Sequence, residues 1–263
     1  MINLNLYNQE GFTNTFQVFN QSDILCNIKK MIYDYTKNEL ESHDSNLSID
    51  NKLKLRFKNK VNLEYQKKLR RYINYSEEFD KIINNEEIKK KFSLIFKNPV
   101  LLNINNFRVH IPTEDSPVFP YHQDQATWFL FEEKVYQDKP IGTMWLSING
   151  ANESNSIEIV KRPNSKLKLF DHKHIVGKGY FGANLSKNFL DNHKTYRVNT
   201  QPGEALIFNN FTIHRTIKSE NKNNMMIPRY SIDLRYYDED KLLTYDVDYR
   251  FKIKKILRKI KII

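Results

Sequence analysis

The sequence is poor in the residues that build disulfide frameworks, clustered metal sites and membrane spans. One cysteine, Cys26, in 263 residues excludes an intramolecular disulfide and any zinc or iron–sulfur site made from several cysteines. The longest apolar runs, such as residues 205–208, are far shorter than the roughly 20 residues that a membrane-spanning helix needs. Residues 1–5 lack the basic start and apolar stretch of a signal peptide. We therefore expect a cytoplasmic protein without a membrane span.

The composition indicates a folded chain with a spread positive charge. Hydrophobic residues make up 40% and aromatic residues 13%, which excludes an intrinsically disordered protein. The length suits one domain, 1–263, with a helix-rich part at about 1–98, a core at about 99–240 and a basic tail at about 241–263. The net charge is +11 but is not gathered into a stripe, so we expect no nucleic-acid partner.

Two kinds of pattern divide the chain. Between residues 22 and 98 the apolar residues recur at helical spacing, which predicts amphipathic helices, whereas 43–60 is polar and predicts a loop. After residue 98 the pattern changes to short segments rich in β-branched and aromatic residues, which predict strands. These segments are 100–104, 107–111, 143–148, 157–160, 205–208 and 229–236. Helices followed by strands indicate an α+β fold, with helices buttressing an antiparallel sandwich or barrel.

Two further segments leave alternatives open. The tail 250–263 alternates basic and apolar residues and predicts an amphipathic helix. Its apolar face would cover the core, or it would contact a partner or an acidic surface. The polar stretch 171–193, with His172, His174 and His193, is interpreted as an exposed loop, or alternatively as a lid over the active site.

His122 and Asp124 are the first pair with ligand spacing. On an extended strand, side chains at i and i+2 point to the same face, so an imidazole and a carboxylate could reach one ion. His214, after a strong strand, is the candidate third ligand. Two imidazoles and one carboxylate on one face are the ligand set of non-haem Fe(II) oxygenases, although zinc accepts the same ligands.

Arg229 and Ser231 form a second pair at i and i+2. A guanidinium with a neighbouring hydroxyl suits bidentate binding of a carboxylate. If one end of a dicarboxylate chelates iron, its far carboxylate needs such a partner. The two pairs together therefore predict 2-oxoglutarate.

The order of these motifs resembles the phytanoyl-CoA dioxygenase family of Fe(II)/2-oxoglutarate-dependent oxygenases over about residues 106–237. The matching segments are 121–124 (YHQD), 144–147 (MWLS), 155–165 (NSIEIVKRPNS), 202–208 (PGEALIF), His214 and 229–231 (RYS). The resemblance implies a double-stranded β-helix, or jelly-roll, core.

The same resemblance implies residue roles. His122, Asp124 and His214 would be the catalytic iron ligands, and Arg229 with Ser231 would bind the distal carboxylate of 2-oxoglutarate. Thr216 and Gln123 are further candidates near the cosubstrate, and Trp145 near the substrate. These sets imply Fe(2+), 2-oxoglutarate and O2 as cofactor and cosubstrates, with release of succinate and CO2.

The sequence departs from the family pattern in ways that keep alternatives open. A polar insertion at 218–224 separates His214 from Arg229, so Arg235, which has the same strand parity, is the alternative anchor and a candidate substrate contact. The predicted reaction is hydroxylation or another oxidation of a small metabolite, such as a carbohydrate or natural-product intermediate. A non-catalytic jelly-roll protein that binds a small molecule and a zinc hydrolase are the alternatives.

Overall fold

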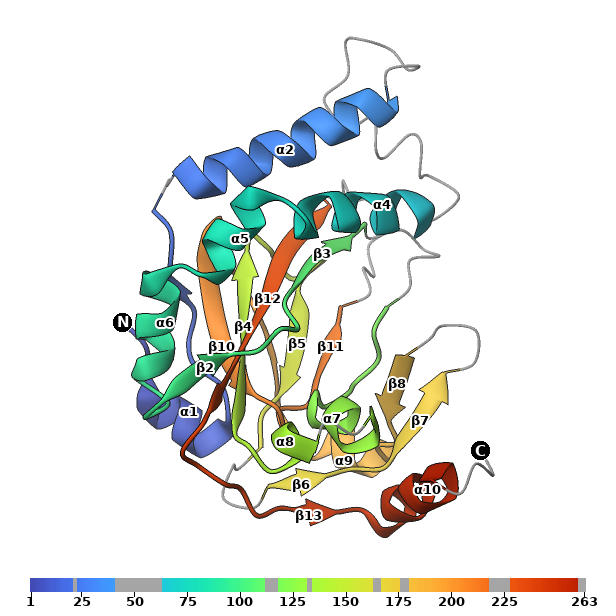
Figure 1. Cartoon of the computed structure of the whole chain (residues 1–263). Helices are drawn as coiled ribbons and strands as arrows, with labels where there is room; N and C mark the ends of the chain where they lie inside the picture. The colour runs from blue at the N-terminus through green and yellow to red at the C-terminus, as the bar shows by residue number, and fades with distance from the viewer. Residues whose placement is uncertain are drawn as a thin grey trace.

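The computed structural model describes residues 1–20, 23–40, 63–111, 118–131, 134–162, 167–175, 180–217 and 228–259 (Figure 1). The loop predicted at 43–60 and the insertion at 218–224 lie outside these residues. The helices are α1 (Leu4–Glu10), α2 (Asp23–Leu40), α4 (Leu63–Asn74), α5 (Glu77–Ile83), α6 (Glu86–Ser93), α7 (Gln125–Phe131), α8 (Lys134–Gln137), α9 (Lys187–Asp191) and α10 (Tyr249–Lys259). Among the described residues, no helix combines the length and apolar character needed to cross a bilayer.

Most of the strands belong to two antiparallel sheets. The main sheet has the order β1 (Phe16–Gln17), β10 (Glu204–Asn209), β4 (Ile141–Ser147), β12 (Arg229–Asp238) and β2 (Pro99–Leu101), and β3 (Asn106–His110) also pairs with β12. The smaller sheet has the order β11 (His214–Thr216), β5 (Ile157–Val160) and β9 (Thr195–Arg197). Outside them, β6 (Lys168–Leu169) pairs with β13 (Asp246–Val247), and β7 (His172–Ile175) pairs with β8 (Tyr180–Ala183). All six strands predicted from sequence are present.

Alternation along the central strand β4 separates two apolar layers. Met144 and Leu146 belong to the cluster that the main sheet forms with the N-terminal helices. Trp145, between them, joins Ile159 of the smaller sheet and Leu206 in a different cluster. Helices therefore cover one face of the main sheet, and the smaller sheet packs on the other face.

The N-terminal helices form where the sequence predicts them. Ile28 and Ile32 of α2 are buried one turn apart, as the apolar spacing requires. Ser76 caps α5 by accepting a hydrogen bond from the Phe79 amide at 3.2 Å. In Figure 1, α4 and α5 lie between α2 and the strands of the main sheet. This layer places α4 against β3, at one end of the main sheet.

The stretch 171–193 is not the exposed loop expected from its polarity. It contains β7, β8 and α9, and His172 is buried. The His172 Nε2 atom accepts a hydrogen bond from the Gln123 amide at 3.1 Å, and its Nδ1 lies 2.9 Å from the Phe170 carbonyl oxygen. Both polar atoms of the imidazole are therefore satisfied by backbone, which is what permits its burial.

The C-terminal helix α10 packs against the body mainly through one aromatic residue and one lysine. Phe251 is fully buried and stacks on Phe129 at 5.3 Å between ring centroids, and Lys254 bonds to Asp171 at 2.6 Å. Ile253 and Ile256 are exposed. The predicted helix is thus confirmed, but a phenylalanine and a lysine, rather than its isoleucines, hold it.

Candidate metal centre

The chain brings His122 and His214 together through their backbones. The His122 amide donates to the His214 carbonyl at 2.9 Å, and the His214 amide donates back to the His122 carbonyl at 3.0 Å. This isolated antiparallel bridge sets the imidazole centroids 4.2 Å apart. A backbone bridge is a rigid way to bring together two side chains that are distant in sequence.

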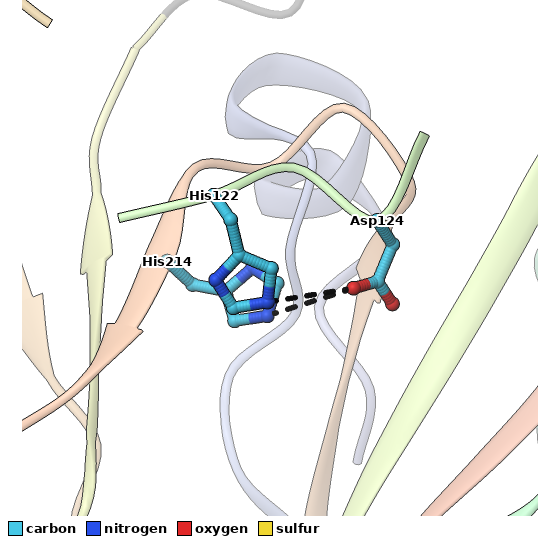
Figure 2. Close-up of side chains that lie close together, drawn as sticks. All are labelled: His122, Asp124 and His214. Atoms are coloured by element: carbon cyan, nitrogen blue, oxygen red, sulfur yellow. Dashed lines mark ion pairs between the residues drawn. The ribbon is translucent and has the colours of Figure 1, made fainter. Parts of the chain in front are cut away.

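Asp124 completes the group from a turn just before α7. Its Oδ1 lies 3.7 Å from His122 Nε2 and 3.9 Å from His214 Nε2, and one ligand atom from each of the three residues lies within 4.8 Å of the others (Figure 2). The expected continuous strand through residues 122–124 is not present. His122 lies in the bridge and Asp124 in the turn, yet both side chains still point to the same side.

The hydrogen bonds of the two imidazoles fix their tautomers. His122 Nδ1 lies 2.9 Å from the Pro120 carbonyl oxygen, and His214 Nδ1 lies 3.1 Å from the Thr212 carbonyl oxygen. A carbonyl oxygen only accepts, so each Nδ1 carries the proton. Burial, with help from His214, lowers the pKa of His122 to about 3, so its ring is neutral at pH 7. Its Nε2 lone pair is consequently free to bind a cation, as ligating histidines require.

The second carboxylate oxygen of Asp124, Oδ2, is bound by Thr143 and Arg235, on the side away from the histidines. Thr143 donates to Oδ2 at 2.9 Å, and Arg235 approaches the same atom with Nη2 at 3.3 Å and Nε at 3.4 Å. Burial alone would raise the pKa of Asp124, but the Arg235 guanidinium, with the hydrogen bond from Thr143, holds it below its ordinary value. Asp124 is therefore an anion with one oxygen anchored and the other facing the imidazoles.

These groups open into a cavity of about 130 Å³ between the two sheets. Four of the sequence-predicted residues besides the triad line it: Trp145, Thr216, Arg229 and Arg235. The cavity wall also includes His110, Arg108, Phe119, Phe208, Arg215 and Asp233. The main sheet's inward face and β11 thus supply most of the predicted site.

Arg229 is a buried cation with unused hydrogen-bonding capacity. Its Nη1 donates to the Asn155 carbonyl at 2.9 Å, and its guanidinium lies 5.4 Å from the centre of the Trp145 ring. Burial lowers its pKa to about 10, so it remains charged at pH 7. Among the described residues, Arg229 Nε, Ser231 Oγ and the nearby His110 Nε2 have no hydrogen-bond partner. Such orphaned polar atoms are costly unless a ligand satisfies them.

Gln123, like Ser231, is a predicted site residue that does not line the cavity. Its Nε2 donates to the Lys168 and Phe211 carbonyls at 2.8 Å each, and its Oε1 accepts from the Phe170 amide at 2.9 Å. Its amide is occupied with backbone and is absent from the cavity wall. The structure therefore supports a role in positioning the segment between the two ligands, not in binding a cosubstrate.

Sequence reasoning did not find Thr143 and His110. Thr143 lies two residues before Trp145 on β4, so strand parity would have placed it on the inner face. His110 pairs with Arg229 across β3 and β12, a register that no sequence pattern discloses. Burial and the charge of Arg229 lower its pKa to about 3, so it adds a neutral imidazole to the wall.

Comparisons with known proteins identify the fold. No family model matches the chain, and no curated protein matches it either. Among solved structures, the non-heme alpha ketoglutarate dependent carbocyclase SnoK from nogalamycin biosynthesis aligns with a TM-score of 0.56 and 11% identity, covering 93% of this chain and 86% of its own. AviO1 from Streptomyces viridochromogenes aligns with a TM-score of 0.55 and 15% identity, covering 89% of this chain and 93% of its own.

A third neighbour was solved with a ligand. EvdO2 from Micromonospora carbonacea var. aurantiaca, complexed with 2-oxoglutarate, has a TM-score of 0.53 and 12% identity over 89% of each chain. Structural alignments with these TM-scores, at identities this low, establish a shared fold. The resemblance drawn from the sequence is confirmed at that level: this chain has the fold of non-haem iron, 2-oxoglutarate-dependent enzymes.

Proposed function

We propose that the protein is an Fe(II)/2-oxoglutarate-dependent dioxygenase that hydroxylates, or otherwise oxidises, a small metabolite and releases succinate and CO2. One observation carries the proposal. The His122, Asp124 and His214 ligand atoms converge in a cavity whose wall also holds a buried arginine with an unpaired Nε. A metal-binding triad and a carboxylate-binding cation in one cavity are what chelation of a keto acid requires.

The donor set fits a divalent metal. His122 Nε2, His214 Nε2 and Asp124 Oδ1 would hold it, because both Nδ1 atoms are committed to carbonyls and Asp124 Oδ2 to Thr143 and Arg235. Bound iron would supply the activation of O2. The residues of the chain then keep the ligands in the correct ionisation state and orientation. Zinc would fit the same donors, and the test below therefore compares the two metals.

Arg229, rather than Arg235, is the proposed anchor for the distal carboxylate of 2-oxoglutarate. Arg235 already bonds to Asp124 and to the Ile104 carbonyl. Arg229 keeps an unpaired Nε, and Ser231, on the same face of β12, keeps an unpaired hydroxyl within the described structure. Together they offer two donors with no competing acceptor. Thr216 and Trp145 would border the bound cosubstrate as cavity residues.

We also propose the type of core, the domain organisation, the substrate class and the cellular location. The two facing sheets support a double-stranded β-helix core, and we treat 1–263 as one oxygenase domain of the phytanoyl-CoA dioxygenase type. The carbocyclase SnoK and the epimerase SnoN belong to nogalamycin biosynthesis, which favours a natural-product or carbohydrate substrate here. The cytoplasm, expected from the sequence, also suits a ferrous cofactor.

The test measures succinate release from 2-oxoglutarate with Fe(II), O2 and a panel of small metabolites. We expect slow uncoupled succinate formation with iron, none with zinc or after chelation, and stimulation by the true substrate. Arg229→Gln should need much more 2-oxoglutarate, whereas Arg250→Gln, on α10, should not. Binding of 2-oxoglutarate without iron-dependent succinate would indicate a binding protein. Turnover with zinc, indifferent to 2-oxoglutarate, would indicate a hydrolase.

A further inference from the structure

The outer part of the cavity presents a second arginine. Arg108, on β3, lines the cavity, and its side chain is 31% exposed, whereas Arg229 is 5% exposed. Its Nε donates to Asp233 Oδ2 at 2.7 Å, and its guanidinium lies 5.8 Å from the centre of the Phe119 ring. Within the described residues, its two terminal amino groups make no hydrogen bond. Arg108 therefore lies at the mouth of the cavity, with two amino groups that have no acceptor among the described residues.

Gln66 adds a second unused donor. It comes from α4, which packs against β3, and it lines the same cavity. Its Nε2 is buried and has no partner among the described residues. A buried amide of this kind destabilises the protein if nothing accepts from it. A ligand in the cavity would remove that cost.

Among the residues that the structure describes, counter-charge at the mouth is scarce. Asp233 serves two guanidinium groups, Arg108 at 2.7 Å and Arg235 at 3.6 Å. Asp124, the other acidic group in the wall, faces the proposed metal. Arg70 of α4 also lies near enough that Arg108, in addition to burial, lowers its pKa. A divalent metal raises the positive charge further, and the dianion of 2-oxoglutarate only offsets that metal.

We propose that the primary substrate carries an anionic group, a phosphate or a carboxylate, which Arg108 and Gln66 bind at the mouth of the cavity. This inference rests on the proposed oxygenase function and adds the chemical class of its substrate. The free guanidinium edge of Arg108 and the unpartnered Nε2 of Gln66 are both donors, and together they favour an acceptor-only group. A cationic substrate would instead leave both donors unsatisfied and would lie against the positive charge of Arg108.

The test titrates methyl phosphate, acetate and neutral glycerol into protein holding zinc and saturating 2-oxoglutarate, by calorimetry at fixed ionic strength. We expect one or both anions to bind and glycerol not to bind. Comparing methyl phosphate with acetate distinguishes a phosphate from a carboxylate ligand. Arg108→Gln should weaken binding by about tenfold or more, the loss expected for a charge-assisted hydrogen bond. Gln66→Glu should weaken it more than Gln66→Leu, because it adds a negative charge.

The controls separate this inference from the proposed function. Arg250→Gln removes an arginine that is likewise paired to one aspartate, Asp248, but lies on α10, and it should leave binding unchanged. Affinity for 2-oxoglutarate, measured separately, should be unaffected by Arg108→Gln. If the wild-type protein has no affinity for 2-oxoglutarate, the oxygenase proposal is refuted instead. If Arg108→Gln fails to fold, Arg108→Lys and Gln66→Glu give the same comparison. Anion affinity that is absent, or unchanged in these variants, overturns the inference.

Discussion

Arg235 holds Asp124 by the carboxylate oxygen that points away from the two histidines, with Nη2 3.3 Å from Oδ2. Arg229, six residues earlier on the same face of β12, has no such acidic partner within 4.0 Å among the described residues and keeps an unpaired Nε. Two arginines with the same strand parity thus have different surroundings. One orients a proposed metal ligand, and the other is available to a carboxylate from outside the chain.

Replacing Asp124 with alanine should abolish iron-dependent succinate release and lower iron affinity by at least about tenfold, since one of three ligands is lost. The fold should persist, because Asp233 lies 3.6 Å from Arg235 and takes over part of its pairing. Circular dichroism and calorimetric iron titration measure the two effects. Asp248→Ala is the matched control, because Asp248 is an aspartate paired with Arg250 of α10, outside the cavity. Full activity in Asp124→Ala would refute the ligand assignment.

Substitution of Arg229 and of Arg235 should affect different steps, cosubstrate binding and iron binding. Arg229→Gln should raise the KM for 2-oxoglutarate about tenfold or more, at the 1.5–3 kcal/mol typical of hydrogen bonds to charged groups, and leave iron affinity unchanged. Arg235→Gln should weaken iron binding first, because Asp124 loses the guanidinium that orients its carboxylate. Steady-state kinetics in 2-oxoglutarate and direct iron titration distinguish them. If Arg235→Gln alone raises the KM, Arg235 is the anchor.

Thr143 should tune the same carboxylate more gently. Its hydroxyl donates to Asp124 Oδ2 at 2.9 Å, so Thr143→Val removes one hydrogen bond without changing side-chain volume much. We expect iron affinity to fall by about fivefold, near the 1 kcal/mol of an ordinary hydrogen bond. Thr143→Ser retains the donor and should bind iron as the wild type does. Equal losses in the two variants would show that packing, not the hydrogen bond, is responsible.

Local periodicity in the sequence predicted many of the helices and strands. The apolar stripe in α2 records which side faces the core, and the alternation of polar and apolar residues in β12 marks a strand, so these elements were predictable from sequence. Three features were not. α7 has seven residues, of which only Gln125 and Thr127 are polar, so it is too short and too apolar for periodicity to mark a helix. His172 is buried because the backbone amide of Gln123, far away in sequence, donates a hydrogen bond to it. Phe251 is buried because it stacks on Phe129, which is also far away in sequence.

The candidate site shows the same division. The ligand types and the pair Arg229 and Ser231 followed from residue chemistry and strand parity. The choice between Arg229 and Arg235 depends on contacts with Asp124 and Asn155, which lie far away in sequence. Gln123 lies outside the cavity wall, since adjacency to two ligands does not determine where a side chain points. Tertiary contacts, not local pattern, decide each of these cases.

The buried imidazole of His172 should make stability fall on acidification. Burial lowers its pKa to about 4, below the roughly 6.5 of an unfolded histidine. The unfolded chain therefore binds more protons between these values, and stability present above pH 6.5 is lost as the pH falls toward 4. Between pH 7 and pH 5 this group alone should cost about 2 kcal/mol. His172→Gln should be less stable at pH 7 but lose about that much less on acidification, as measured by urea unfolding.

Phe251 should be the residue that fixes α10. Its ring is fully buried and stacks on Phe129, so Phe251→Ala removes a large side chain and leaves a cavity, at a cost of about 3–5 kcal/mol. Ile253 and Ile256, on the same helix, are 49% and 58% exposed, and their alanine variants should change stability by less than about 0.5 kcal/mol. Thermal unfolding of the three variants measures the difference. A larger loss at either isoleucine would mean that this face of α10 packs against something in solution, such as a second copy of the chain.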